Sequence, residues 1–195
     1  MKGRLRAPAL AVQIVALAAF TGCAELPRKS ESVAADAAAI AAPFDAEGRL
    51  SARRGSDGVA GQFVWTHDGP RDQIVLSTPL GQTIARLSGD AAGVRVEASD
   101  GRVETATAWD ALTARTLGFP LPVAGLAAWL RGLPRPESPN AMERDGAGRP
   151  LLLTQDGWEI AYSYADDAAS RAARLTLRYP GGEPIELRIV VDRWQ

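Results

Sequence analysis

The residues that could carry out catalysis are few in this chain of 195 residues. It contains one histidine, His67, so a Ser/His/Asp site would depend on that residue, and the chain has no G-x-S-x-G elbow. Because His67 precedes the turn pair Asp68-Gly69, we predict that it is a hydrogen-bonded surface residue. One histidine and one cysteine are also too few for a His/Cys metal site. We therefore expect no metal and no cofactor.

Other polar motifs also predict loops and turns. Gly146-Ala147-Gly148 lacks the third glycine and the strand-to-helix setting of a dinucleotide-binding loop, so a turn is predicted there. Asp166 and Asp167 are adjacent, so their side chains tend to diverge into solvent. Glycosidase chemistry needs two facing carboxylates and would have to recruit Glu159 or Asp110. We expect a protein that is not an enzyme.

The single cysteine, Cys23, has the clearest chemical role. It follows a short basic stretch and an apolar run from Ala9 to Phe20, which is too short for a hydrocarbon core that takes about 20 residues but suits a secretory signal. Phe20-Thr21-Gly22-Cys23 resembles the lipobox of bacterial lipoproteins, which implies a lipidated thiol. Ala24, in place of the aspartate that retains such proteins at the inner membrane, implies the outer membrane. A plain signal peptide with an incidental cysteine is the alternative.

The sequence divides into three predicted parts. Residues 1–22 are the lipoprotein signal peptide, residues 23–43 are the lipidated cysteine and a tether rich in alanine, serine and charge, and residues 44–195 are one folded domain. Without residues 1–22 the chain has four more acidic than basic side chains. It lacks the clustered positive charge that nucleic acid requires. We expect a monomer that does not bind nucleic acid.

Short alternating apolar runs separated by turns predict antiparallel strands from Gly48 onward. Two helices interrupt them: one begins with a capping box at residues 107–110 and ends at Gly118, and the other runs from Pro122 to Gly132. The prediction is a mainly β (α+β) fold, a single curved antiparallel sheet of about 11 strands that forms an unclosed barrel covered by helices. Strand pattern alone leaves open whether the concave side is packed or hollow.

Leu80 is an apolar residue at a position where no neighbouring side chain is expected to cover it. It lies between Pro79 and Gly81 at the tip of a predicted hairpin, so its side chain is expected to point into solvent. A protein held at a membrane gives such a side chain something apolar to contact.

Six blocks of sequence, in this order and spacing, resemble the LolB family of outer-membrane lipoprotein receptors. The blocks are Gly48-Arg49-Leu50, Phe63-Val64-Trp65, Ser77-Thr78-Pro79-Leu80-Gly81-Gln82-Thr83, Leu117-Gly118-Phe119-Pro120-Leu121-Pro122-Val123, Trp129-Leu130-Arg131-Gly132-Leu133-Pro134 and Gln155-Asp156-Gly157-Trp158. The likeness spans residues 44–194. Any one block alone would be weak evidence.

The resemblance implies a function and a site. It implies that the protein accepts lipoproteins from a soluble LolA-type periplasmic carrier, binds their acyl chains in a hydrophobic cavity, and inserts them into the phospholipid of the outer membrane's inner leaflet. It assigns membrane insertion to the Pro79-Leu80-Gly81 loop. The expected cavity residues are Phe63, Trp65, Ile74, Leu76, Leu112, Leu126, Trp129, Ile160, Tyr162 and Leu177. The alternative is a lipid-anchored scaffold for envelope assembly with a packed core.

Overall fold

The computed structural model describes residues 38–195, so the predicted signal peptide and Cys23 lie outside the described residues. Residues 38–41 form a helical turn that leads into the sheet. The elements that follow are β1 (Phe44–Arg54), β2 (Asp57–Asp68), β3 (Arg71–Ser77), β4 (Thr83–Asp90), β5 (Gly93–Ala98), β6 (Val103–Ala106), α2 (Trp109–Leu117), α3 (Val123–Trp129), β7 (Asn140–Arg144), β8 (Pro150–Gln155), β9 (Trp158–Ser163), β10 (Arg174–Tyr179) and β11 (Ile185–Trp194). Within residues 38–195, the helices are too short or too polar to cross a membrane.

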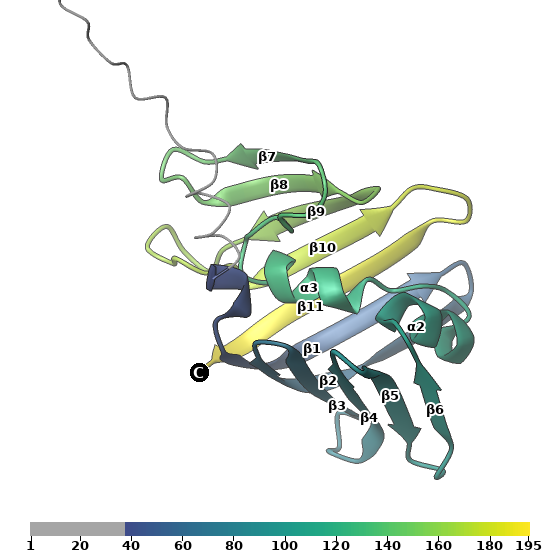
Figure 1. The fold of residues 1–195 in the computed structure, drawn as a ribbon. Coiled ribbons are helices and arrows are strands. Elements are labelled where there is room, and N and C mark those ends of the chain that lie inside the picture. The colour runs from purple at the N-terminus through teal and green to yellow at the C-terminus, as the bar shows by residue number, and fades with distance from the viewer. Residues whose placement is uncertain (1–37) are drawn as a thin grey trace, which may run out of the picture.

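All eleven strands form one antiparallel sheet in the order β6-β5-β4-β3-β2-β1-β11-β10-β9-β8-β7. The long pairing of β1 with β11 joins the first six strands to the last five. The sheet curves strongly, and α2 and α3 cover its concave side (Figure 1). Since β6 and β7 are its two edges, the barrel is unclosed. The predicted fold class is confirmed.

The concave face is apolar because the strands alternate as the sequence predicts. In β9, Trp158, Ile160 and Tyr162 are buried, whereas the three residues between and after them are exposed. β10 and β11 show the same alternation. Side chains with a period of two share one face of a strand, so every strand that alternates contributes to one continuous apolar surface.

The start of α2 differs from the prediction. Its N-cap is Ala108, whose backbone is extended and which makes no side-chain capping hydrogen bond, so the predicted capping box with Thr107 is wrong. The buried Trp109 packs so closely on β4 that a Cβ on Gly89 would lie 2.4 Å from its Cζ2 atom. Tertiary packing therefore determines where the helix begins. At the other end, Gly118 has the positive φ of 81° expected of a residue that ends a helix.

The edge strand β7 was not predicted. Its five residues are exposed except for the half-buried Met142. An edge strand at the rim of a sheet needs no buried face, so it carries no alternating pattern to detect. It is held by its pairing with β8, from Asn140 opposite Gln155 to Arg144 opposite Pro150.

A buried glutamine joins α3, the connection after it, and β8. Gln155 is 2% exposed, and its Oε1 atom accepts hydrogen bonds from Trp129 Nε1 at 2.8 Å and from the backbone nitrogen of Arg135 at 2.9 Å. Its Nε2 atom donates to the carbonyl oxygens of Arg135 and Ser138 at 2.8 and 3.0 Å. Every hydrogen-bonding group of this amide therefore has a partner, which fixes α3 against the sheet.

Replacing Gln155 with leucine should destabilise the domain. The change leaves the indole N–H of Trp129 and the backbone groups of Arg135 and Ser138 buried without partners, which should lower the free energy of unfolding by roughly 2 to 4 kcal/mol. Urea denaturation of Gln155→Leu measures this, with Gln62→Leu as control because Gln62 is exposed on β2. Equal midpoints for the two variants would contradict the role given to Gln155.

Candidate functional site

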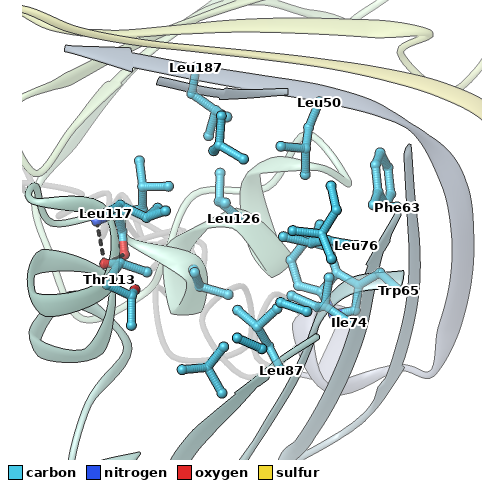
Figure 2. A pocket seen from close by; sticks show the side chains of 18 of the residues that line it. Leu50, Phe63, Trp65, Ile74, Leu76, Leu87, Thr113, Leu117, Leu126 and Leu187 are labelled. Carbon is cyan, nitrogen blue, oxygen red and sulfur yellow. Dashed lines mark hydrogen bonds between the residues drawn. The ribbon is translucent and has the colours of Figure 1, made fainter. Parts of the chain in front are cut away.

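An apolar cavity of about 280 Å³ lies between the first half of the sheet and the two helices (Figure 2). Its lining combines inward residues of β1 to β5, residues of α2, α3 and the segment between them, and two residues of β11. The apolar lining residues are Leu50, Val59, Phe63, Trp65, Ile74, Leu76, Ile84, Ala85, Leu87, Val96, Ala98, Leu117, Leu121, Val123, Leu126, Leu187 and Ile189.

Five of the residues predicted for the cavity line it: Phe63, Trp65, Ile74, Leu76 and Leu126. Their side chains come from β2, β3 and α3 and surround one space (Figure 2). The sequence-based prediction missed the equivalent inward residues of the neighbouring strands. They include Leu50, Val59, Leu87, Val96 and Leu187. The strand alternation of these residues was a usable signal, because it places them on the same face.

The other five predicted residues do not line the cavity: Leu112, Trp129, Ile160, Tyr162 and Leu177. All five are buried in the packed core, four of them with no exposed surface. For the three strand residues and Trp129, the reason is the position of α3, whose Trp129 is held by Gln155 over the last strands of the sheet. The concave side is therefore filled in its second half and hollow in its first half.

Tyr162 is the one polar side chain among these five. Its hydroxyl group is buried and has no hydrogen-bond partner among the described residues. Burial raises its pKa well above the ordinary value. The phenol therefore stays neutral at physiological pH and acts as a core side chain.

The interior of the cavity has no free polar group that would suit a polar ligand. Thr113 and Thr116 are the hydroxyl residues of the lining, and each donates to a carbonyl oxygen one turn earlier in α2, at 3.0 Å. Charged residues occur only at the rim, where the Arg115 guanidinium lies 3.7 Å from Glu104 and Arg102 is largely exposed. An apolar interior with a charged rim suits a hydrocarbon chain that has a polar end.

The hairpin between β3 and β4 projects Leu80 into solvent. The backbone nitrogen of Gly81 donates to the carbonyl of Thr78 at 2.9 Å, and the nitrogen of Thr78 donates to the carbonyl of Gln82 at 2.8 Å. Gly81 has a φ of 82°, as a three-residue hairpin loop requires at its last position. Leu80 is 90% exposed, the largest value among the exposed large apolar side chains of the described residues.

His67 is buried, so its predicted surface position is wrong. It is 5% exposed because β2 extends to Asp68 and turns its ring inward against Phe44, with the ring centroids 5.0 Å apart. Its Nδ1 atom lies 2.9 Å from Asp72 Oδ1, and its Nε2 atom lies 3.1 Å from the carbonyl oxygen of Ile40. The prediction that its hydrogen bonds are satisfied is confirmed.

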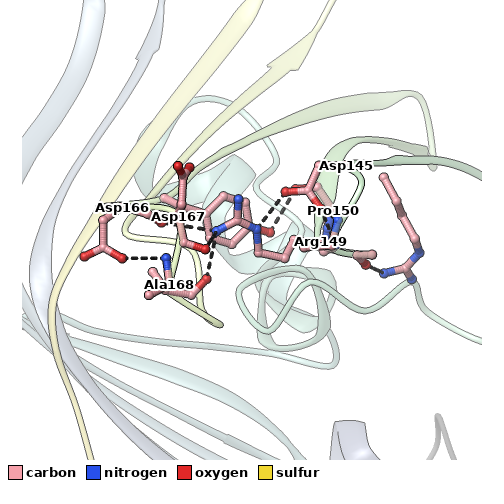
Figure 3. Close-up of polar contacts among 11 residues, drawn as sticks. Asp145, Arg149, Pro150, Asp166, Asp167 and Ala168 are labelled. Carbon is pink, nitrogen blue, oxygen red and sulfur yellow. Dashed lines mark hydrogen bonds and ion pairs between the residues drawn. The ribbon is translucent and has the colours of Figure 1, made fainter.

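The turn at residues 145–149 and the loop around Asp166-Asp167 form a structural cluster (Figure 3). The Arg149 guanidinium donates to Asp145 at 2.7 Å and to the carbonyl oxygens of Asp166, Asp167 and Ala169. Hydrogen bonds from Arg149 hold the pKa of Asp145 below its ordinary value. Asp166 and Asp167 are exposed, as expected for a solvated loop. The cluster ties two loops together at one end of the sheet.

Residues 38–195 contain no group of three His, Cys, Asp or Glu side chains that could hold a metal ion. Glu159 and Asp110, the other carboxylates considered for catalysis, are exposed residues of β9 and α2. Glu159 lies in a strand whose buried residues alternate with it, so it points away from the concave side. The cavity and the Leu80 hairpin are the features that remain as a site.

The fold and the cavity define a class of protein: an unclosed antiparallel barrel that holds an apolar cavity under two helices. A family model described as "Outer membrane lipoprotein LolB" matches residues 42–194. The chain belongs to the LolB family of outer-membrane lipoproteins, which confirms the family and the location predicted from the sequence.

Curated relatives and a solved structure agree with this placement. The outer-membrane lipoprotein LolB of Thiobacillus denitrificans is 39% identical over 91% of this chain and 92% of its own length. The LolB of Azoarcus sp. is 33% identical over 95% of this chain and 94% of its own length. The crystal structure of a LolA superfamily protein from Nitrosomonas europaea has the same fold, with a TM-score of 0.52, 7% identity, and coverage of 85% of this chain and 92% of that one.

Two leucine truncations should distinguish the packed half of the concave side from the hollow half. Leu177→Ala removes a fully buried side chain and should lower the free energy of unfolding by about 2 to 5 kcal/mol, because it leaves a new void. Leu76→Ala only enlarges an existing cavity and should cost clearly less. Chemical denaturation of both variants tests this, and the reverse order of stability would contradict the division.

Proposed function

We propose that this protein accepts lipoproteins from a soluble periplasmic carrier of the LolA type, binds their acyl chains in the cavity, and inserts them into the inner leaflet of the outer membrane. The observation that carries the proposal is the apolar cavity itself, whose lining consists mainly of hydrocarbon side chains. Membership in the LolB family supports it. In this proposal residues 1–22 are removed, Cys23 is lipidated, and residues 23–43 tether the domain of residues 44–195.

Acyl chains need such a cavity because water is a poor solvent for them. Each buried CH₂ group contributes about 0.8 kcal/mol, so exposing the chains of one lipoprotein to water would cost on the order of tens of kcal/mol. A receptor without a nucleotide-binding motif has to receive them directly from another cavity. We expect the direction of transfer to follow affinity, which rises from carrier to receptor to bilayer.

The cavity has to widen to hold this ligand. Its volume of about 280 Å³ is just below that of most ligand pockets, which range from about 300 to 1,000 Å³. The element best placed to move is α2, which lines one side with Thr113, Thr116 and Leu117. Its C-terminal end is held from the sheet by Arg54, whose Nη1 atom donates to the carbonyl oxygen of Gly118 at 2.8 Å. Such a bond at the protein surface exchanges readily with water.

Leu80 is the proposed point of contact with the membrane. The hairpin holds an apolar side chain in water with no protein surface to cover it. Burying a leucine side chain in hydrocarbon contributes roughly 1.5 to 3 kcal/mol, so a bilayer is a favourable place for it. Ile84, which follows the same hairpin on β4, lines the cavity, so the proposed insertion point adjoins the proposed binding site.

The competing function is a lipid-anchored scaffold for envelope assembly. A scaffold needs a packed core and no ligand, whereas the described domain has an unfilled apolar space on one side. The family consists of lipoprotein localisation factors, and we propose that this chain likewise performs no catalysis. Saturable binding of a lipophilic probe separates a receptor from a scaffold.

Filling the cavity should abolish ligand binding without unfolding the domain. Ala98→Trp places a large side chain in the cavity lining, whereas Ala161→Trp places the same side chain on the exposed face of β9. We expect titration with a fluorescent fatty acid to give at least a tenfold weaker affinity for the first variant, a loss of about 1.4 kcal/mol, and no change for the second. Equal binding by both would place the ligand elsewhere.

Leu80→Glu should separate acceptance of a lipoprotein from its release. A carboxylate at the tip resists burial in hydrocarbon, so transfer of a labelled lipoprotein to liposomes should fall while uptake from the carrier is retained. Leu151→Glu is the matched control, because Leu151 is an exposed leucine at the other end of the sheet. The assay uses the soluble Cys23→Ala protein, so the receptor's own anchor does not contribute. If Leu80→Glu releases normally, Leu80 is only a surface residue.

A further inference from the structure

The helical turn before β1 is fastened to the domain by backbone contacts. The Arg131 guanidinium, just after α3, donates to the carbonyl oxygens of Ala39 at 2.6 Å and Ala42 at 2.7 Å, and also to that of Ile40. His67 Nε2 lies 3.1 Å from the same Ile40 oxygen. We call residues 38–43, with these contacts, the root of the tether. Hydrogen bonds to three backbone carbonyl groups therefore fix the place where the chain joins the domain.

The root is also packed against the end of the sheet where the protein chain ends. Arg131 lies over the Phe44 ring, 4.9 Å from its centroid, and Phe44 in turn contacts Trp194. Asp45 and Gln195 exchange two backbone hydrogen bonds of 2.9 and 3.1 Å. Figure 1 shows the turn before β1 beside the C-terminus. The root therefore lies at one defined end of the strands.

The direction of the strands places Leu80 at the opposite end. Asp72, whose carboxylate binds His67, stands at the start of β3, next to the root. β3 runs away from the root, and the hairpin that carries Leu80 follows its last residue. Eight residue steps lead from Asp72 to Leu80, and five of them lie within β3, so the two residues are at most about 26 Å apart at the rise of a strand. A protein anchored at one end must reach the membrane with the other.

The chain between anchor and root is long enough for this. Seventeen residue steps separate Cys23 from Ile40, and an extended chain spans at most about 60 Å over that length. With the hairpin pointing at the bilayer, the root stands at most about 26 Å from the surface. The sequence therefore supplies roughly twice the reach that this orientation needs.

We infer that the root fixes the point where the tether joins the domain at the end of the sheet opposite Leu80, and that the number of residues between Cys23 and the root is what allows the hairpin to reach the membrane. The surface that the Leu80 hairpin contacts is the same phospholipid bilayer that holds the lipid on Cys23. This inference rests on the proposed function, because it assumes that Leu80 contacts that bilayer.

The test shortens the tether without changing its charge. Deleting residues 27–36 removes two basic and two acidic side chains and leaves Ala24 in place. Seven residue steps then remain, which reach about 25 Å only when fully extended, so a shortened chain of ordinary conformation falls short of the distance needed. A thiol-reactive, environment-sensitive fluorophore at Leu80→Cys reports immersion of the hairpin, and the same fluorophore at Ala147→Cys, an exposed residue at the root end, is the control. Lipidated proteins are reconstituted in phosphatidylethanolamine and phosphatidylglycerol vesicles.

The full-length protein should show a blue-shifted emission at position 80 and an aqueous emission at position 147. The shortened protein should remain on the vesicles but lose the shift at position 80, and a ten-residue Gly/Ser replacement of residues 27–36 should restore it. A shift retained in the shortened protein, or not restored by the replacement, overturns the inference about tether length. An aqueous emission at position 80 in the full-length protein instead overturns the membrane role proposed for Leu80.

A second variant tests the pinning itself. Arg131→Gln removes the guanidinium that holds residues 39–42 and leaves the His67 contact to Ile40, so it should loosen the root and lengthen a short tether by up to about four residues, or roughly 14 Å. In the shortened protein it should therefore restore part of the emission shift at position 80. Thermal denaturation of full-length Arg131→Gln checks that the domain is folded. A folded double variant with no recovery would show that Arg131 does not pin the root.

Discussion

The constraint on which the rest of the structure depends is the apolar concave face of the sheet. Eleven strands in one antiparallel sheet present more apolar surface than the two covering helices can bury, because α2 has nine residues and α3 has seven. A face of this kind must either close on itself, pack against other elements or enclose space. This sheet does not close, since β6 and β7 remain edges. Its sequence therefore leaves a hollow wherever the helices do not fill the concave side.

The two helices divide the concave side unequally. Trp129 of α3 is completely buried, and its indole is fixed by Gln155, which also holds the connection that leads to β7. A fully satisfied buried polar network specifies a single arrangement, so the half of the barrel under α3 is rigid and packed. α2 is packed on the domain through Trp109 and Leu112, but its polar contacts are different in kind. Arg54 and Arg115 bind backbone carbonyls at the surface, and the hydroxyls of its threonines bind only within the helix or beside it. In the proposed function, the half under α3 therefore provides stability, and the half under α2 is the one that opens for the ligand.

Much of the fold could be predicted from the sequence, because strand alternation is a local property. The inward faces of β9 to β11, both helices and the Gly118 helix end follow from the spacing of apolar residues and from glycine. The edge strand β7 could not be predicted, because an exposed strand has no alternation to read. The start of α2 was misplaced because the packing of Trp109 on Gly89 outweighs a side-chain cap. His67 was misplaced because its partner Ile40 is 27 residues away in the sequence.

The candidate site was half predicted for a related reason. Alternation identifies Phe63 and Ile160 equally well as inward residues, but it does not say that α3 covers one and leaves the other facing space. That distinction depends on the packing between a helix and strands far from it in the sequence. The prediction of Leu80 depended only on its neighbours Pro79 and Gly81, which determine a tight hairpin with Leu80 at its exposed tip. A tight turn can therefore be predicted from sequence more reliably than which inward residues a helix covers.

The energies also limit what the Leu80 hairpin can do in the proposed function. One leucine side chain contributes roughly 1.5 to 3 kcal/mol when it leaves water, whereas the acyl chains of a lipoprotein represent tens of kcal/mol at about 0.8 kcal/mol per CH₂ group. Because the chains are out of water both in the cavity and in the bilayer, most of this energy cancels during release, and the driving force is the difference between these two apolar environments. The gain has to come from the acyl chains themselves, which leave a cavity of about 280 Å³ for a bilayer that imposes no such limit. What Leu80 can provide is position, because a single apolar contact at the correct end of the sheet keeps the cavity next to the membrane while the chains move.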